Sequence, residues 1–353
     1  MSSKRPPKPA WELDEHRLRA AMIRRVERST EIQADLAFSA IPSLFEHYAS
    51  RCEALFELAA RPLEGAQRAQ FRNLLSQALR TGFEASAHAK VVLRLRSDPS
   101  PAQTISYEIG IQTRDIADVY ATWLRASPEA PHFGTHADAK VLQVAREFVH
   151  PEGRALDIGA GTGRNSLPLA QLGLTVDAVE LTPGFAAKLR EAAASSSLPV
   201  NAIEGDAFDP ALALERDAYS LLVASEVAAS HFRDGDDLRE FFEFAADKLQ
   251  SGGMLVFNAF VARAGYSPDP VARQISPSVL SSIVGEADLL RARDGLPLEL
   301  ISNESCSEYE KAGLPSEAWP PTPWFEQWAN GNNLFDLPGL APCELRWLVY
   351  RKS

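Results

Sequence analysis

From residue 154 onward the chain alternates short apolar runs with amphipathic segments, and no other feature constrains its fold as much. Each apolar run has the length of a buried strand, and each intervening segment has the periodicity of a helix. Strands separated by helices favour a mainly parallel sheet that is covered on both faces. The sequence therefore predicts an α/β fold with strands at 155–158, 174–179, 200–203, 219–224 and 254–260, and two more at 298–302 and 344–351.

A glycine-rich turn follows the first of these strands and leads into a helix expected at 166–172. It reads Leu-Asp-Ile-Gly-Ala-Gly-Thr-Gly-Arg from Leu156 to Arg164. Glycines let the backbone turn sharply and let a ligand approach without meeting a Cβ atom. The turn also lies where open α/β folds bind ligands. A dinucleotide fingerprint would place its third glycine at position 164, where this chain has arginine, so the spacing disfavours a nicotinamide cofactor.

One acidic residue stands at or after the end of each of the first three strands. Asp157, before the first glycine, would repel a pyrophosphate and suits a ligand that carries an ammonium group. Glu180 ends the second strand, where its carboxylate can accept hydrogen bonds from ribose hydroxyls. Asp206 follows the third strand and suits an adenine amino group. Together with the glycines, these acids predict a pocket for a cationic nucleoside amino acid.

These motifs resemble, in order and at suitable spacing, those of class I S-adenosylmethionine-dependent methyltransferases over about residues 135–261. The resemblance includes the strand from Leu221 to Ser225. The run Gly163-Arg164-Asn165-Ser166 is also similar to small-molecule methyltransferases of the tellurite-resistance type. The resemblance implies a Rossmann-like seven-stranded methyltransferase sheet with S-adenosyl-L-methionine as its cofactor.

The resemblance also assigns individual residues to parts of this cofactor. Asn165 is one such candidate, with capping of the following helix as an equal alternative. The residues assigned to the methionine portion are Asp157, Gly159, Ala160, Gly161 and Gly163, and Ser225 contributes backbone near it. Glu180 is assigned to the ribose. Leu181 is assigned to one face of adenine, and Asp206 and Ala207 to its polar edge.

The segment from Ser225 to Phe232 follows the fourth strand and is expected to face the transferred methyl group. His231 is the candidate general base, because an imidazole titrates near neutral pH. Glu226 is the candidate for orienting an acceptor hydroxyl or amine. The alternative for both is an ordinary packing or hydrogen-bonding role. The run lacks the Pro-Pro-aromatic motif of nitrogen-methylating enzymes, so we expect a hydroxyl oxygen as the methyl acceptor.

A Trp/Pro-rich insert at about 303–343 separates the last two expected strands. In the family that the sequence resembles, this insert often covers the acceptor pocket. Its aromatic residues are therefore candidates for walling off the acceptor and excluding water. The alternative is that they pack the N-terminal region onto the sheet. The candidates are Tyr309, Trp319, Trp324 and Trp328.

Residues 1–126 are expected to form an all-helical N-terminal domain, and 127–353 the methyltransferase domain. Apolar stripes at helical spacing support helices in the N-terminal region, and the first of them comprises Leu18, Met22 and Val26. The helical domain is expected to serve as an acceptor-binding lid, with a dimerisation element or a platform for a protein partner as alternatives.

Composition narrows the possible functions. The net charge of −11 argues against a large nucleic-acid interface. Three well-separated cysteines suggest no metal site. The absence of a long apolar run leads us to expect a cytoplasmic protein that does not enter a membrane. We expect the protein to transfer a methyl group to a small-molecule acceptor. A homodimer is the candidate oligomeric state. A protein methyltransferase and a non-catalytic cofactor-binding module are the alternatives.

Overall fold

The computed structural model describes residues 14–27, 31–97, 104–127, 131–233 and 235–353. The chain divides into two compact units, 1–113 and 114–353. The helix α4 (Ile116–Ala126) therefore belongs to the second unit, although the sequence pattern grouped it with the N-terminal region. Residues 128–130, next to the domain boundary that we expected at 126/127, lie outside the described residues.

The first unit combines helices with a small sheet. A three-stranded antiparallel sheet has the order β1-β2-β3, and Tyr107 in β3 packs against Phe56 and Phe71 of two helices. The elements are α1 (Glu15–Glu27), β1 (Gln33–Ser39), a 3-10 turn (Pro42–Leu44), α2 (Phe45–Leu58), α3 (Gly65–Ala85), β2 (Lys90–Ser97) and β3 (Ile105–Gln112).

The all-helical expectation for this region is therefore wrong. Buried and less buried side chains alternate only in part along β2, where Val91, Leu93 and Leu95 are buried on one face. The two strands that pair with β2, β1 and β3, lie in separate parts of the chain. The stripe that begins at Leu18 is also not core, because Met22 and Val26 in α1 are each 70% exposed. The apolar stripes of α2 and α3, by contrast, are mostly buried as expected, although Leu74 in α3 is 40% exposed.

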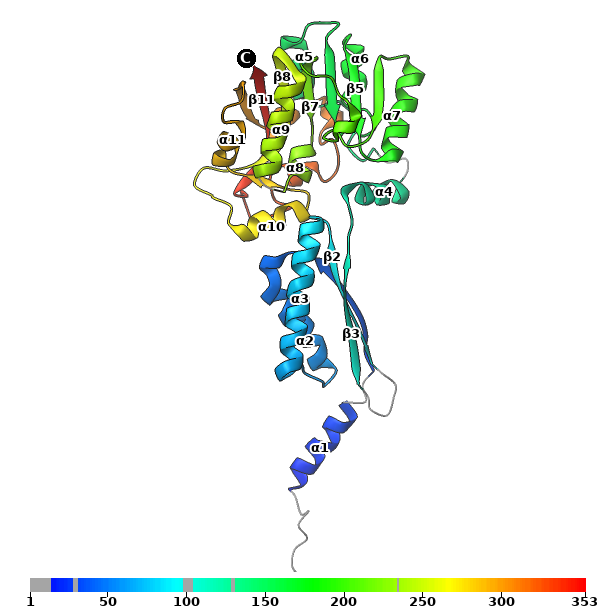
Figure 1. Cartoon of the computed structure of the whole chain (residues 1–353), viewed down its shortest axis with the longest axis vertical. Helices are drawn as coiled ribbons and strands as arrows, with labels where there is room; N and C mark the ends of the chain where they lie inside the picture. The colour runs from blue at the N-terminus through cyan, green and yellow to red at the C-terminus, as the bar shows by residue number, and fades with distance from the viewer. Residues whose placement is uncertain (1–13, 28–30, 98–103, 128–130, 234) are drawn as a thin grey trace, which may run out of the picture. The chain divides into compact units, whose positions relative to one another are not determined.

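The second unit contains the predicted α/β sheet (Figure 1). Its strands follow the order β10-β11-β8-β7-β4-β5-β6, with β9 paired to β8 as an additional short strand. All neighbours from β6 to β8 are parallel, whereas β11 is antiparallel to both β8 and β10. The strands are β4 (Arg154–Ile158), β5 (Thr175–Glu180), β6 (Val200–Glu204), β7 (Tyr219–Ala224), β8 (Leu249–Ala262), β9 (Ile283–Val284), β10 (Leu298–Ser305) and β11 (Cys343–Lys352).

Helices cover both faces of this sheet and divide its core in two, as alternate residues of the buried strands require. One core cluster contains residues of α5, α6 and α13, and the other contains residues of α9 and α11 (Figure 1). Besides α4, the helices are α5 (Ala139–Phe148), α6 (Ser166–Gln171), α7 (Pro183–Ser196), α8 (Val227–His231), α9 (Gly235–Lys248), α10 (Pro270–Ser278), α11 (Glu286–Arg293), α12 (Cys306–Gly313) and α13 (Phe325–Ala329), with 3-10 turns at Pro210–Leu212 and Ser316–Ala318.

No helix among the described residues has both the length and the apolar content that crossing a bilayer requires. No group of three or more His, Cys, Asp or Glu residues among them could hold a metal ion.

Candidate functional site

A cavity of about 370 Å³ opens at the carboxyl ends of the parallel strands. It is bounded by the turns that follow β4 to β7, by α4 and by the loop that precedes α5. Most of the residues that we expected to bind cofactor or to act in catalysis come together around it. These are Asp157, Gly159, Ala160, Gly161, Asn165, Glu180, Leu181, Asp206, Ala207, Ser225, Glu226 and His231.

The glycine-rich turn after β4 requires glycine for two different reasons. Gly159 has φ +67°, and a Cβ atom there would lie 2.7 Å from Cγ2 of Val227. Gly163 has φ +94°, and its Cβ atom would lie 2.5 Å from Cδ1 of Leu189 in α7. The first glycine therefore lets the turn lie against α8 at the cavity wall. Gly163 is not part of the cavity lining and instead allows close helix packing.

Asp157 is the next-to-last residue of β4 and is only 2% exposed. Its Oδ2 accepts a 2.6 Å hydrogen bond from the Ser166 hydroxyl, and no described residue donates to its other oxygen. Burial raises the pKa of this carboxyl group to about 7, although the Ser166 hydrogen bond and the charge of Arg164 oppose the shift. A buried carboxylate with so little compensation favours a cationic ligand group.

Glu180 at the end of β5 holds the glycine turn in place. Its two oxygens accept from the backbone N–H groups of Gly161, at 2.8 Å, and Thr182, at 2.7 Å. Burial raises the pKa of Glu180, and these backbone hydrogen bonds oppose that shift. Each carboxylate oxygen retains a lone pair for a ligand hydroxyl. Beyond β6, Asp206 is exposed and accepts from the Phe208 N–H at 3.0 Å.

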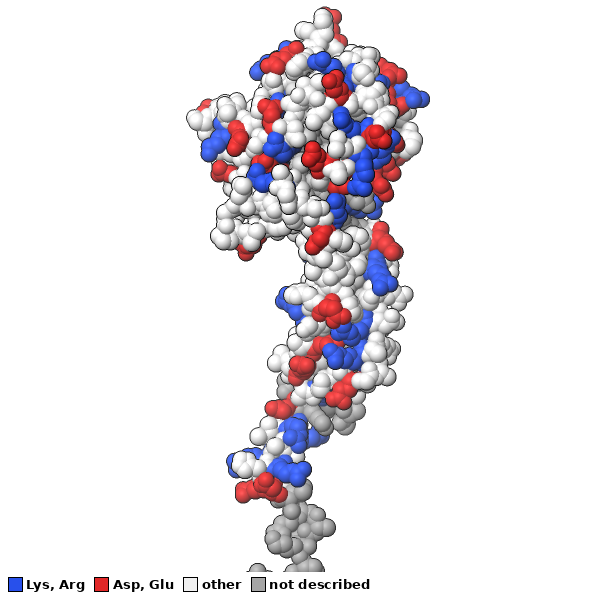
Figure 2. All heavy atoms as spheres, turned by 90° about the vertical axis from the view of Figure 1, so that its left-hand side faces the viewer, with Lys and Arg blue, Asp and Glu red and all other residues white. Residues whose placement is uncertain are grey.

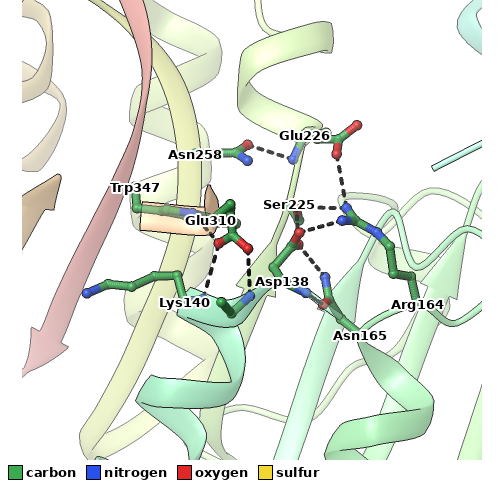
Figure 3. A network of polar contacts seen from close by, with 10 residues as sticks. Asp138, Lys140, Arg164, Asn165, Ser225, Glu226, Asn258, Glu310 and Trp347 are labelled. Atoms are coloured by element: carbon green, nitrogen blue, oxygen red, sulfur yellow. Dashed lines mark hydrogen bonds and ion pairs between the residues drawn. The ribbon is translucent and has the colours of Figure 1, made fainter. Parts of the chain in front are cut away.

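A buried polar network borders the cavity beneath the turn after β7 (Figure 3). Asp138, at the start of α5, pairs with the guanidinium of Arg164 and accepts from the Ser225 hydroxyl at 2.7 Å. Asn165 exchanges two hydrogen bonds of 2.9 Å with Asp138, one to its backbone and one to its side chain. The side chain of Asn165 makes no capping hydrogen bond to α6, so its structural role is to join α5 to the glycine turn.

Glu226 follows β7 in a left-handed conformation with φ +63°. Its backbone N–H donates to Oδ1 of the buried Asn258 at 2.6 Å, and its Oε1 accepts from Nη2 of Arg164 at 3.0 Å (Figure 3). Burial raises the pKa of Glu226 to about 7, with Arg164 opposing the shift. The carboxyl group is thus held at the cavity from both its backbone and its side chain.

Three aromatic residues, Tyr120, Phe133 and Phe185, complete the wall around His231, and the sequence did not single out any of them as functional. The hydroxyl of Tyr120 in α4 lies 3.3 Å from Nε2 of His231. The Tyr120 ring also packs edge-on against Phe133 and Phe185, which line the same cavity. The only sequence signal was the apolar stripe of α4, which reports a buried face but not what covers it.

The four aromatic residues of the insert are absent from this cavity lining, so the expectation that they wall off this pocket is not met. Trp328 is 5% exposed, donates from Nε1 to the Leu280 carbonyl at 2.9 Å and packs on Phe260. Trp319 and Tyr309 pack against the hydrophobic core cluster that contains Trp328. The Tyr309 ring faces the ammonium group of Lys140. Trp324 is 41% exposed.

The surface of the second unit shows no dominant charge on the face drawn in Figure 2, where acidic and basic side chains are interspersed. The cavity differs from this surface. Its described lining contains six carboxyl groups and one guanidinium. The site therefore attracts cationic ligand groups more strongly than the surface around it.

Residues 155–253 match the family model described as a methyltransferase domain. No curated protein matches the sequence. Among solved structures, a putative sarcosine dimethylglycine methyltransferase from Galdieria sulphuraria shares 16% identity over 68% of this chain and 99% of its own, with a TM-score of 0.48. A second similar structure is geranyl diphosphate C-methyltransferase from Streptomyces coelicolor A3(2), in complex with Mg2+, geranyl diphosphate and S-adenosyl-L-homocysteine. It shares 16% sequence identity over 61% of this chain and 78% of its own, with a TM-score of 0.46.

These structural similarities are too distant to indicate an acceptor or an activity for this chain. The family match covers the stretch from β4 to the early part of β8, which includes the glycine turn and the acids after β5 and β6. The chain thus contains a class I methyltransferase domain, and the cofactor of this domain is S-adenosyl-L-methionine.

Proposed function

We propose that this protein transfers a methyl group from S-adenosyl-L-methionine to a hydroxyl oxygen of a small-molecule acceptor. The observation that carries the proposal is that one cavity joins the glycine turn to the wall formed by Glu226 and His231. Such a cavity aligns a donor and an acceptor and keeps water from the reacting atoms, which are the main requirements of an in-line displacement.

The residues present fit this cofactor. Gly159 and Gly161 leave backbone space at the cavity, and the buried Asp157 carboxylate suits the ammonium group of the methionine portion. Glu180 retains acceptor capacity for the ribose hydroxyls. Asp206, Ala207 and Leu181 line the cavity where adenine is expected. When bound, the cofactor supplies an electrophilic methyl group on a sulfonium sulfur.

On the acceptor side, His231 is the proposed general base. A neutral imidazole can take the proton of an acceptor hydroxyl by way of Tyr120: the Tyr120 hydroxyl gives its proton to Nε2 and receives the acceptor's proton on its own oxygen. The Tyr120 hydroxyl fixes the orientation of the ring, and Phe133 and Phe185 exclude water from this end of the cavity. Transfer to a hydroxyl oxygen then leaves the released proton on the imidazole.

The test begins with calorimetric titration of S-adenosylmethionine, S-adenosylhomocysteine and NADH into the purified full chain, beside Asp157→Ala. We expect the two sulfur nucleosides to bind, the substitution to abolish their binding, and NADH not to bind. Binding of NADH alone, or of none of the three, would overturn the proposal.

The acceptor is then sought by supplying radiolabelled cofactor with a library of hydroxyl compounds. Label in extractable small molecules supports the proposal. Label only in precipitated protein from a lysate would instead favour a protein methyltransferase. With any acceptor found, His231→Gln is expected to lower turnover by about 10²-fold while cofactor affinity stays unchanged.

A further inference from the structure

Among the carboxyl groups of the cavity, Glu226 is the one held rigidly beside His231 with an oxygen still available. We propose that Glu226 binds a protonated amino group of the acceptor, so that the substrate class is a hydroxyl compound that also carries an amine. This inference rests on the proposed function and names the substrate of the same site.

The position of Glu226 is fixed at two points. Its backbone N–H donates to Asn258, which is 1% exposed and lies on the central strand β8. Its Oε1 accepts from Arg164, while no described residue donates to Oε2. In Figure 3 the second carboxylate oxygen points away from the network. A group that is held in this way is pre-organised to receive one hydrogen-bond donor from a ligand.

The charge around Glu226 is not balanced by Arg164 alone. The guanidinium is shared with Asp138, which is 4% exposed and pairs with it through a second nitrogen. Two carboxylates therefore face one cation in a buried region. Because a buried carboxylate without full compensation is unfavourable, a positively charged ligand group at Oε2 would stabilise the site.

The other acidic groups of the cavity have different surroundings. Asp157 and Glu180 belong to the two turns around the proposed cofactor position. Asp206 and Glu240 are exposed. Asp237 accepts hydrogen bonds from the backbone and side chain of Arg233. Only Glu226 combines a side chain that is 15% exposed with a place next to α8, where the acceptor is expected.

The walls near Glu226 also suit a cation. Tyr120 and Phe133 line the same cavity, and aromatic rings attract ammonium groups through their π faces. A protonated amine has no lone pair and cannot itself attack the methyl group. Its role would be to anchor the acceptor, which leaves the hydroxyl as the nucleophile, in agreement with the proposed function.

The test measures binding of small probes to the full chain saturated with S-adenosylhomocysteine. The probes are two matched pairs, benzylamine with benzyl alcohol and phenethylamine with phenethyl alcohol, titrated by ligand-observed NMR. We expect each amine to bind roughly tenfold more tightly than its alcohol. Glu226→Gln should remove this preference, and Glu226→Asp should retain part of it. Glu204→Gln, which removes one exposed negative charge outside the cavity, is the charge-matched control.

Each outcome decides the inference. The absence of an amine preference in the wild-type chain, or its persistence in Glu226→Gln, would overturn it. If Glu226→Gln instead weakens the binding of S-adenosylhomocysteine itself, Glu226 serves the ammonium group of the cofactor, and the inference fails while the proposed function stands. Failure of the wild-type chain to bind S-adenosylhomocysteine would overturn the proposed function.

Discussion

The hydroxyl of Tyr120 lies 3.3 Å from Nε2 of His231, although 111 positions separate the two residues in the sequence. The contact joins α4 to α8 and brings an O–H group to the candidate base. Burial raises the pKa of Tyr120 far above its usual range, and the charges of Glu226 and Glu180 add to this shift. Tyr120 therefore remains protonated near neutral pH, and its hydroxyl can donate to Nε2 of His231 when that nitrogen carries no proton.

Tyr120→Phe removes this donor and keeps the ring that packs on Phe133 and Phe185. We expect turnover of an identified acceptor to fall about tenfold, because the imidazole loses its orienting hydrogen bond. The affinity for S-adenosylhomocysteine should stay within about twofold. The measurement is kcat and KM across pH 6–9, with Tyr309→Phe as a control that makes the same atomic change outside the cavity. Equal losses in the two variants would contradict the role given to Tyr120.

A structural feature of this protein can be predicted from the sequence when the residues that form it lie close together in the chain. The strands and the glycine turn of the second unit follow from short patterns, and the acids at strand ends converge because parallel strands share an edge. The sheet of the first unit could not be predicted in the same way, since β2 pairs with residues more than fifty positions earlier.

The same distinction holds within the site. Asp157 and Glu180 were found because they adjoin motifs. The pairing of Asp138 with Arg164 depends on where α5 packs, and the approach of Tyr120 depends on where α4 packs. Neither is encoded in a local pattern. The prediction that the tryptophans of the insert line the acceptor pocket failed because it rested on composition. Aromatic content alone cannot distinguish the wall of a pocket from a hydrophobic core.

Asp157→Asn tests the charge of the cofactor site without changing its shape. We expect affinity for S-adenosylmethionine to fall at least about tenfold. Since burial raises the pKa of Asp157 to about 7 and a cation favours its ionised form, wild-type binding should strengthen from pH 6 to pH 8. Calorimetry in buffers of different ionisation enthalpy should show proton release on binding. Proton release that is unchanged in the variant would exclude Asp157 as its source.

Gly159→Ala should distort the glycine turn at the cavity. A Cβ atom meets Val227 at 2.7 Å, and the positive φ adds about 1–3 kcal/mol of strain. We expect a lower thermal midpoint and loss of most affinity for S-adenosylhomocysteine. Gly173→Ala is the matched control, because its φ is +97° but nothing lies within 4 Å of the added atom. The control should lose some stability and bind normally. A comparable loss of affinity in both variants would mean that the effect is not local to the turn.

The insert tryptophans offer a test of core packing against acceptor binding. Trp328→Ala should lower the free energy of unfolding by about 3–5 kcal/mol, because it removes a buried ring and leaves the Leu280 carbonyl without its donor. Trp324→Ala should cost less than about 1 kcal/mol. Urea denaturation gives both values. A large loss of acceptor affinity in a stable Trp324 variant would restore the insert as part of the acceptor site.

The buried carboxyl groups also predict how stability depends on pH. Burial raises the pKa values of Asp157, Glu226 and Glu310 to about 7, whereas unfolded carboxyl groups titrate near 4. Between these values the native state binds more protons than the unfolded state, so the free energy of unfolding falls as the pH rises. Carboxyl groups with lowered pKa values, such as Asp177 and Asp288, change the pH dependence of stability only below about pH 4. They do not affect it between about pH 4 and about pH 7.

We therefore expect stability to decrease from pH 5.5 to about pH 7, by about 1.4 kcal/mol per pH unit for each fully linked proton, and to level off by pH 8. Glu310→Gln should make this dependence shallower, because the Glu310 carboxyl group lies fully buried against the N-terminus of α5 and the indole of Trp347 (Figure 3). The exposed Glu317→Gln should leave it unchanged. Urea denaturation at pH 5.5, 6.5, 7.25 and 8 measures the slope. A stability that rises with pH over this range would show that these groups are ionised in the native state.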